Sequence, residues 1–281
     1  MARMPVTGGR VAIRSLREVE LIRASSRIVA EVLERMQEWV AVGVTTAELD
    51  QRAEELMRAR GGVPSFKGYL GYPASICVSV NEQVVHGIPG ERVLAEGDVV
   101  GVDVGAVKNG YHGDAARTFA VGEVTPEARR LMEVGEEALR RAIAAACPGS
   151  TVGDIGFAVQ SYIEKQGFSV VRDLVGHGIG ERLHEEPQVP NYGRPGTGVE
   201  LKPGMVLAIE PMVNIGYWRV VTLADQWTVV TADRSLSVHY ENTVAITADG
   251  PEVLTQTGLT RSETGRYQPP AGSEPWPRRK A

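Results

Sequence analysis

Seven side chains that can bind a metal ion or transfer a proton recur along this 281-residue chain, and they are His86, Asp103, Asp114, His177, His184, Glu210 and Glu241. Asp103 follows the apolar run 99–102, and Glu210 follows the apolar run 205–209. A buried carboxylate is costly unless a positive charge meets it. Two such acids, two further acids and three histidines predict a metal pair as the counter-charge, and therefore a metal-dependent hydrolase.

The composition of this set indicates the kind of metal. Four carboxylates with one or two imidazoles suit hard or borderline divalent ions better than a thiolate zinc site. Two such ions, about 3.5–4 Å apart, hold a water between them and lower its pKa towards about 7. The remaining histidines would then stabilise an oxyanion or exchange protons. Cobalt, manganese, iron and zinc all tolerate these ligands, so the sequence leaves the identity of the two ions open.

A β-hairpin is expected to bring the first two acids together. Asn109-Gly110 is a turn signal, and a turn about Lys108-Asn109 places Asp103 directly opposite Asp114. Directly opposed residues have Cβ atoms roughly 4.5–5.5 Å apart, a distance at which two carboxylates need a proton or a cation between them. The alternative is a pair of solvated acids on an open face. His112 shares a strand face with Asp114 and is expected to pack or to support a ligand.

The histidines lie in glycine-rich segments. Seven residues separate His177 from His184, a spacing that puts them on opposite faces of a strand unless Gly178 and Gly180 bend the chain. His86 precedes a glycine in a predicted turn, where the backbone is expected to come close to another segment. Glu241 shares a strand face with His239, so an ordinary ion pair is the alternative to a metal ligand there.

The predicted elements that position these residues are helices and short strands. Helical spacing of apolar residues, with glycine stops, predicts four helices at 15–42, 47–60, 125–146 and 152–166. Strands are expected at 75–81, 99–104, 111–121, 170–174, 206–210, 227–231 and 237–247. Residues 1–14 are expected to form a loose arm, 15–257 a single catalytic domain, and the Gly/Pro-rich stretch 258–281 a disordered tail.

The order of elements repeats. Gly43 and Gly149 open similar segments 106 residues apart, and Asp103 and Glu210 end similar segments 107 residues apart. Two halves, each with two helices followed by strands, would therefore place an acid at the same point. A pseudo-twofold relation between the halves would bring both acids into one shared site. The fold class expected is α+β.

Composition excludes several functions. The chain is 43% hydrophobic with a formal net charge of -5, and no basic stretch is interleaved with aromatic residues, which argues against nucleic-acid binding. No stretch approaches 18 apolar residues, so no membrane span is expected. Cys77 and Cys147 are the only cysteines, and neither lies in a CxxC motif. These features indicate a reducing compartment, and we expect a cytoplasmic protein.

At these residues the chain resembles the type I methionine aminopeptidases, which have the pita-bread fold. The resemblance covers about residues 14–256. Its motifs are His86-Gly-Ile-Pro, Asp103 with Gly110-Tyr-His-Gly-Asp114, Gly176-His-Gly-Ile-Gly, His184-Glu-Glu-Pro, Lys202-Pro-Gly-Met-x4-Glu210-Pro and Glu241-Asn-Thr. It implies two halves around a central dinuclear metal site, removal of the N-terminal methionine of nascent polypeptides or peptides, a preference for a small second residue, transient proximity to the ribosome and a monomer.

The resemblance also implies a role for each residue. Asp103 and Asp114 would bind the second metal, His177 and Glu210 the first, and Asp114 and Glu241 would bridge the two. His86 would contact the scissile amide and His184 the carbonyl oxygen, which with Glu210 form the catalytic set. Residues in the position of the methionine pocket are Tyr69, Tyr72, Cys77 and Trp227. From the residues alone, plain core packing is the alternative for these four.

Two departures and two rival functions remain at this point. Leu183 stands where many members of the family have an aromatic residue, and Phe66 where many have a cysteine, so both could reshape the pocket. A prolidase or aminopeptidase P of the same fold is one rival, although only 14 residues precede the first expected helix. A non-catalytic binding protein of this fold is the other. Methionyl and Xaa-Pro peptides would separate the first rival, and metal titration the second.

Overall fold

The structure is a computed structural model, and it describes residues 10–256. All four expected helices are present, and their bounds are α1 (Leu16–Trp39), α2 (Thr46–Ala59), α3 (Pro126–Ala145) and α4 (Val152–Lys165). Hydroxyl side chains begin each helix. Ser15, Thr45 and Thr151 each form a capping box with an acid three residues later, which satisfies backbone N–H groups that a helix start leaves free.

Fifteen short strands form in the described residues, together with a 3₁₀ turn at Tyr69–Gly71. The strands of the first half are β1 (Val63–Pro64), β2 (Cys77–Val80), β3 (Gln83–Val85), β4 (Val99–Lys108) and β5 (Tyr111–Ala120). Those of the second half are β6 (Ser169–Val170), β7 (Val175–Gly178), β8 (Glu185–Pro190), β9 (Val206–Ile209), β10 (Met212–Asn214), β11 (Val220–Thr222), β12 (Val229–Thr231), β13 (Ser237–His239), β14 (Asn242–Thr247) and β15 (Gly250–Val253). The single strand expected at 237–247 is therefore broken at Tyr240 and Glu241.

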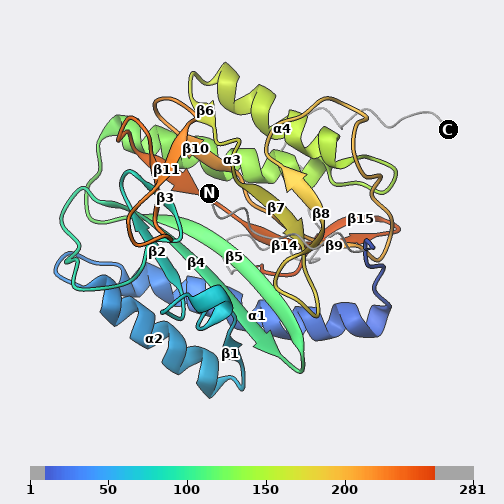
Figure 1. Cartoon of the computed structure of the whole chain (residues 1–281), viewed down its shortest axis with the longest axis horizontal. Helices are drawn as coiled ribbons and strands as arrows, with labels where there is room; N and C mark the ends of the chain where they lie inside the picture. Colours follow the sequence, from blue (N-terminus) through green and yellow to red (C-terminus); the bar gives the residue numbers. More distant parts are fainter. Residues whose placement is uncertain (1–9, 257–281) are drawn as a thin grey trace.

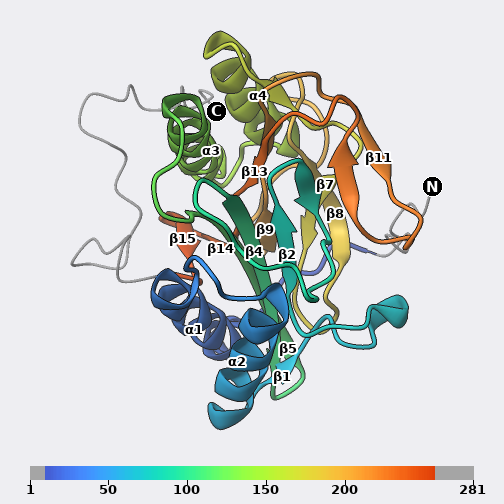
Figure 2. The same ribbon diagram turned by 90° about the vertical axis from the view of Figure 1, so that its left-hand side faces the viewer.

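Two larger sheets dominate, one in each half. Strands β1, β4 and β2 pair in that order, with β5 on β4, and β15-β14-β9-β7-β8 form the five-stranded sheet of the second half. Of the two smaller sheets, β13-β10-β6 belongs to the second half, whereas β11-β12-β3 pairs β3 of the first half with β12 of the second. Helix α1 contacts β4 and β5, whereas α3 contacts β9, β10 and β13. Figures 1 and 2 show both helical pairs outside the strands, with α1 and α3 along the same side of them.

The predicted repeat is visible in the backbone hydrogen bonds. Gly43 N–H donates to Leu94 O, and Gly149 N–H donates to Leu201 O at the corresponding point of the second half. Both glycines have positive φ, +90° and +85°, where a side chain would be strained. Each half also has its own apolar core, one beneath α1 and α2 and one beneath α3 and α4. The α+β class with two similar halves is confirmed.

The β4–β5 hairpin corrects the expected register. Its turn residues are Asn109 and Gly110, with φ values of 54° and 80°. A two-residue hairpin turn of this kind needs positive φ at both central residues, and Lys108 does not suit that requirement. Strand β4 consequently runs on past Asp103 to Lys108, and Asp103 lies opposite Ala116 rather than Asp114. The prediction that the two acids are directly opposed was wrong by two residues.

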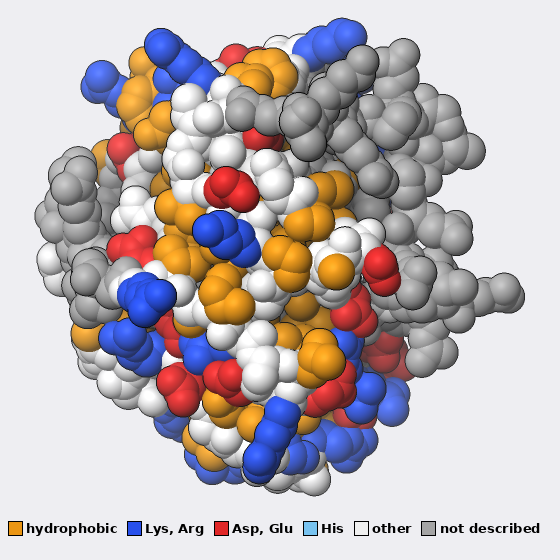
Figure 3. Space-filling view, turned by 90° about the vertical axis from the view of Figure 1, so that its right-hand side faces the viewer, with side chains coloured by type: hydrophobic (Ala, Val, Ile, Leu, Met, Phe, Trp, Pro, Cys, Tyr) orange, Lys and Arg blue, Asp and Glu red, His pale blue; other side chains and the backbone are white. Residues whose placement is uncertain are grey.

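The N-terminal arm is described only from residue 10, and the tail expected at 258–281 lies outside the described residues. Arg14 is held by its neighbours, because its N–H donates to Gly204 O and its guanidinium binds the Glu185 carboxylate. None of the helices within residues 10–256 has the length and apolar character needed to cross a membrane. On the face drawn in Figure 3, basic and acidic side chains are intermixed with apolar ones.

Candidate metal centre

The first half contributes two acids through neighbouring strands. Asp103 on β4 and Asp114 on β5 lie on the same face of the sheet as diagonal neighbours, because Asp114 faces Gly105, two residues beyond Asp103. Gly105 has no side chain, which leaves room on this face for the Phe66 ring. An added Cβ would lie 2.5 Å from that ring. Cys77 on β2 is directly opposite Asp103. The sheet therefore sets a candidate pocket wall beside a candidate metal ligand.

The second half contributes His177, Glu210 and Glu241. His177 on β7 pairs with Ala208 on β9, and Glu210 follows the last residue of that strand, so that His177 Nε2 lies 3.6 Å from Glu210 Oε1. Glu241 occupies the break between β13 and β14, where its N–H donates to Ala116 O of the first half. Ligand atoms of Asp114, His177 and Glu241 all lie within 4.8 Å of one another.

The electrostatics of the cluster favour a cation. Burial and nearby carboxylates raise the pKa values of Asp114, Glu210 and Glu241 well above their usual range, and burial raises that of Asp103 to about 7. Buried oxygens of Asp103, Asp114 and Glu241 have no hydrogen-bond partner. Unpaired buried carboxylate oxygens are costly, and divalent ions offset both the repulsion and the unpaired oxygens. The residues present therefore fit a metal site.

The predicted convergence of His177 and His184 is confirmed. Their ring centroids are 4.4 Å apart at an interplanar angle of 67°. The Nδ1 atom of His177 lies 2.9 Å from Gly178 O, which orients the ring with Nε2 towards Glu210. The Nδ1 atom of His184 lies 2.8 Å from the Tyr69 hydroxyl. Burial lowers the pKa of His177 to about 4 and that of His184 to about 2, so both rings are neutral near pH 7.

His86 lies in the tight turn that the sequence indicated. Its φ is 59°, and a Cβ on the following Gly87 would be 2.3 Å from Val78 O, so the turn closes directly on β2. The His86 ring is edge-on to Trp227, with centroids 6.4 Å apart. Burial lowers the pKa of His86 to about 4. The imidazole therefore remains uncharged beside the aromatic wall.

The four expected pocket residues pack in one apolar cluster that also includes Phe66 and Leu183. Tyr72 and Trp227 meet edge to face at 5.1 Å. The Tyr72 hydroxyl donates to Ile76 O and Gly87 O, which ties the ring to β2 and to the His86 turn. Cys77 is buried, and burial raises the pKa of its thiol well above the usual range, which suits a wall rather than a nucleophile.

Three residues near the centre carry roles that the sequence did not predict. His239 points its Nε2 atom at Glu210 and Glu241, with 3.8 Å and 4.0 Å to their Oε2 atoms. Arg117 and Thr118 on β5 hold the backbone of the same segment. His112, by contrast, lies 2.9 Å from Ser65 Oγ, consistent with the expected packing role. The contact of His239 with Glu210 and those of Arg117 and Thr118 with the 239–241 segment join residues distant in the sequence, so only the tertiary structure identifies them.

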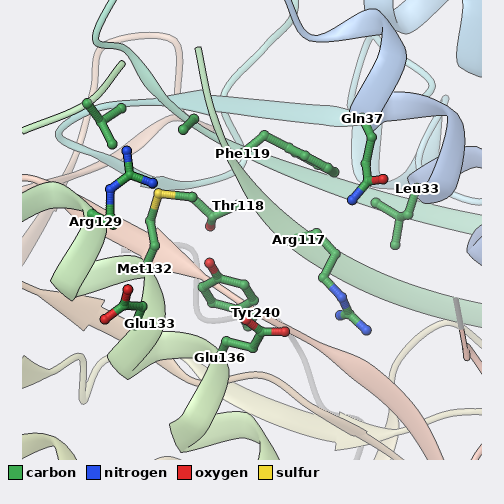
Figure 4. Close-up of a pocket in the computed structure, with 12 residues that line it drawn as sticks. Leu33, Gln37, Arg117, Thr118, Phe119, Arg129, Met132, Glu133, Glu136 and Tyr240 are labelled. Atoms are coloured by element: carbon green, nitrogen blue, oxygen red, sulfur yellow. The ribbon is translucent and has the colours of Figure 1, made fainter. Parts of the chain in front are cut away.

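A cavity of about 300 Å³ lies away from the cluster, between α1, α3 and β5 (Figure 4). Its lining includes Gln37, Arg117, Glu136 and Tyr240. Arg117 connects the two regions, since its guanidinium donates to Glu241 O at 2.5 Å and to Asn242 Oδ1 at 2.8 Å. The cavity is thus behind the cluster, on the helical side of the strands.

Comparison with known proteins is consistent with this geometry. The model of metallopeptidase family M24 matches residues 20–248. A methionine aminopeptidase of Clostridium perfringens is 53% identical over 245 residues, which cover 87% of this chain and 98% of that protein. The crystal structure of a methionine aminopeptidase from Thermotoga maritima has a TM-score of 0.87 and 46% identity, covering 88% of this chain and all of the other.

The expected rival fold relative is also present among the solved structures. A prolidase from Pyrococcus furiosus has a TM-score of 0.71 and 27% identity. The match covers 87% of this chain but only 65% of the prolidase chain. Similarity to the methionine aminopeptidases is therefore higher in identity, in structural score and in the share of the relative that is covered.

Proposed function

Because the chain belongs to metallopeptidase family M24, among its methionine aminopeptidases, we propose that it removes the N-terminal methionine from peptides and newly made chains. The observation that carries this proposal is the pairing of Cys77 with Asp103 across β2 and β4. It sets an apolar residue next to a cluster of four carboxylates, of which Asp114 and Glu241 are buried and Asp103 and Glu210 partly buried. A substrate whose methionine side chain enters the pocket presents its first peptide bond to the cluster.

The proposed metal ligands come from both halves. Asp103 and Asp114 would hold one divalent ion, His177 and Glu210 the other, and Asp114 and Glu241 would bridge them. Two ions held there supply Lewis acidity towards the scissile carbonyl and activate a water for attack. Cobalt, manganese, iron and zinc each suit this donor set. All proposed ligands and pocket residues lie in one chain, so a monomer is sufficient for the proposal.

The histidines handle the substrate. The Tyr69 hydroxyl lies 2.8 Å from Nδ1 of His184. We assign the hydroxyl as the donor, which places the hydrogen of the neutral ring on Nε2, where an N–H group can stabilise the negative charge that develops on the carbonyl oxygen. We assign His86, whose turn closes against β2, to the scissile amide. Glu210 completes the proposed catalytic set through its contact with His177.

The pocket explains the choice of methionine. An unbranched thioether fits between aromatic rings, and each sulfur–aromatic contact contributes about 0.3–1.5 kcal/mol. Leu183 and Phe66 both pack in this cluster, so they shape the pocket without contributing a metal ligand. A small second residue is expected to be preferred, because the second side chain must pass close to the carboxylate cluster.

A steady-state peptide assay tests the proposal. We expect hydrolysis of Met-Ala-Ser, slower hydrolysis when the second residue is tryptophan, and none when the first is valine or isoleucine. Activity should disappear with a chelator and return with one or more of the four metals. Cleavage of Xaa-Pro peptides in preference to Met-Ala-Ser would instead support the prolidase alternative. Metal binding without hydrolysis of any of these peptides would support a non-catalytic binding protein.

The cellular setting is part of the same proposal. Cys77 is a buried thiol, which is compatible with the reducing cytoplasm. Newly made chains are the substrate class proposed here, and transient proximity to the ribosome would follow from that class. Activity on such chains in a cytoplasmic fraction is the corresponding measurement.

A further inference from the structure

His239 is a buried histidine that has no role in the proposed reaction. Its side chain is 4% exposed, and its Nε2 atom has no hydrogen-bond partner. That atom nevertheless lies 3.8 Å from Glu210 Oε2 and 4.0 Å from Glu241 Oε2. An unpaired buried nitrogen that faces two proposed metal ligands requires an explanation, because unsatisfied buried polar atoms are costly.

Several hydrogen bonds hold the backbone around His239. The Thr118 hydroxyl donates to His239 O at 2.8 Å and accepts from His239 N–H at 3.1 Å. His239 also pairs with Met212 across β13 and β10. Two residues later, the Arg117 guanidinium and Ala116 O hold the backbone of Glu241. One segment therefore presents a proposed ligand and a neighbouring imidazole from a rigid frame.

The charges around the imidazole of His239 indicate which of its two nitrogens carries the hydrogen. Of the described basic and imidazole side chains, only His177 and His239 approach the Glu210 carboxylate within 4.0 Å. His177 turns its Nε2 atom to the cluster with Nδ1 on a backbone carbonyl, the arrangement of a metal-binding histidine. A nitrogen lone pair facing two carboxylates would be repelled, whereas an N–H group would be attracted. Glutamate χ3 rotates over a broad range, so a small rotation of either carboxylate brings it into hydrogen-bond distance.

We infer that His239 is a positioning residue for the metal centre, donating from Nε2–H to the carboxylates of Glu210 and Glu241. Through this donor it fixes two proposed ligands, one directly after β9 and one between β13 and β14. The inference rests on the proposed function, since it assigns a role at the same metal site. It predicts a contribution to metal affinity that is independent of substrate binding.

Substitutions at position 239 test the inference by metal titration. His239→Leu removes the donor, and we expect the Kd for Mn²⁺, measured by calorimetry, to rise about 10–100-fold, as for other hydrogen-bonding supports of metal ligands. His239→Gln retains an N–H donor at similar reach and should stay within a few-fold of the unsubstituted protein. His112→Gln is the matched control, because that histidine contacts Ser65 and not a proposed ligand. Thermal unfolding verifies that each variant is folded, and His239→Ala replaces the leucine variant if that one is not.

Two outcomes would overturn the inference. If His239→Leu binds Mn²⁺ as tightly as the unsubstituted protein, the imidazole does not position the ligands. If leucine and glutamine weaken binding equally, and the visible spectrum of the Co²⁺-loaded protein loses one ligand in both, His239 is itself a ligand. Failure of the proposed function gives a different result from failure of this inference. In that case the unsubstituted protein is folded, with or without bound metal, and does not cleave Met-Ala-Ser.

Discussion

In the absence of metal, the unfolding free energy of this protein should decrease as the pH rises above neutrality. The cause is the carboxylate cluster of Asp103, Asp114, Glu210 and Glu241. Burial raises the pKa of Asp103 to about 7, and burial with neighbouring carboxylates raises the pKa values of the other three well above their usual range. A carboxylate with a raised pKa in the folded state keeps its proton there while the unfolded chain has lost it. Its contribution to stability is complete below the unfolded pKa of about 4 and is lost as pH rises through the folded value.

The interval from pH 7 to 8 isolates this effect. The buried histidines have lowered pKa values, so their contribution changes mainly below the unfolded value of about 6.5. Each proton retained only by the folded state removes about 1.4 kcal/mol of unfolding free energy per pH unit. For a protein of this size that corresponds to a fall in Tm of about 3–6 °C per proton over the interval.

The assay is thermal unfolding followed by circular dichroism, with chelator and with saturating Mn²⁺, at several pH values between 7 and 8. With chelator the Tm should fall, whereas with Mn²⁺ it should hold or rise, because metal binding displaces the protons. Glu241→Gln removes one titrating group while keeping the shape, and should make the fall shallower, by at most about 1.4 kcal/mol per pH unit. A chelated protein whose Tm is constant or increases from pH 7 to 8 would refute the carboxylate cluster.

Three substitutions address the rest of the site. Asp114→Asn keeps the shape but removes the charge of a proposed bridging ligand, so peptide hydrolysis should be abolished with the circular dichroism spectrum unchanged; substantial turnover in a fully metal-loaded variant would contradict the two-metal assignment. His184→Ala should lower kcat about 10²–10³-fold with little change in KM, since an oxyanion contact is made mainly in the transition state, and an effect confined to KM would show a ground-state role instead. Gly105→Ala should lower the unfolding free energy by about 1–3 kcal/mol in denaturant titration, because its methyl group meets the buried Phe66 ring; no loss would show that the ring moves aside freely, and a loss that Phe66→Leu does not relieve would show that another neighbour causes it.

The sequence predicted the helices and most of the carboxylates and histidines that cluster in the structure, because the signals for both are local. A cap residue such as Thr45 and a stop such as Gly43 lie next to the helix that they define, and an acid after an apolar run is visible without tertiary structure. The hairpin register was missed by two residues, because the turn depends on positive φ at Asn109 and Gly110. Strand β7 was not predicted, because Gly176 and Gly178 interrupt any alternation of apolar and polar residues. Its pairing with β8 and β9 is what defines the strand.

His239 shows the limit of the sequence most clearly. Its neighbour two positions away, Glu241, suggested an ordinary ion pair. The second carboxylate that it faces, Glu210, comes from a different strand. Only the pairing of β13 with β10 and the contacts from β5 bring the two acids to the same nitrogen. Such three-way contacts depend on how sheets cross, which spacing along one chain does not encode.

The two similar halves contribute different side chains to the cluster. Asp103 and Glu210 occupy equivalent positions, yet the first half adds a second carboxylate, Asp114, whereas the second half adds an imidazole, His177. The symmetry of the backbone therefore stops at the side chains, with only oxygen donors at one end of the cluster and a nitrogen donor at the other. Harder ions favour the first end and softer ions the second. Two like halves thereby give the cluster two chemically different ends.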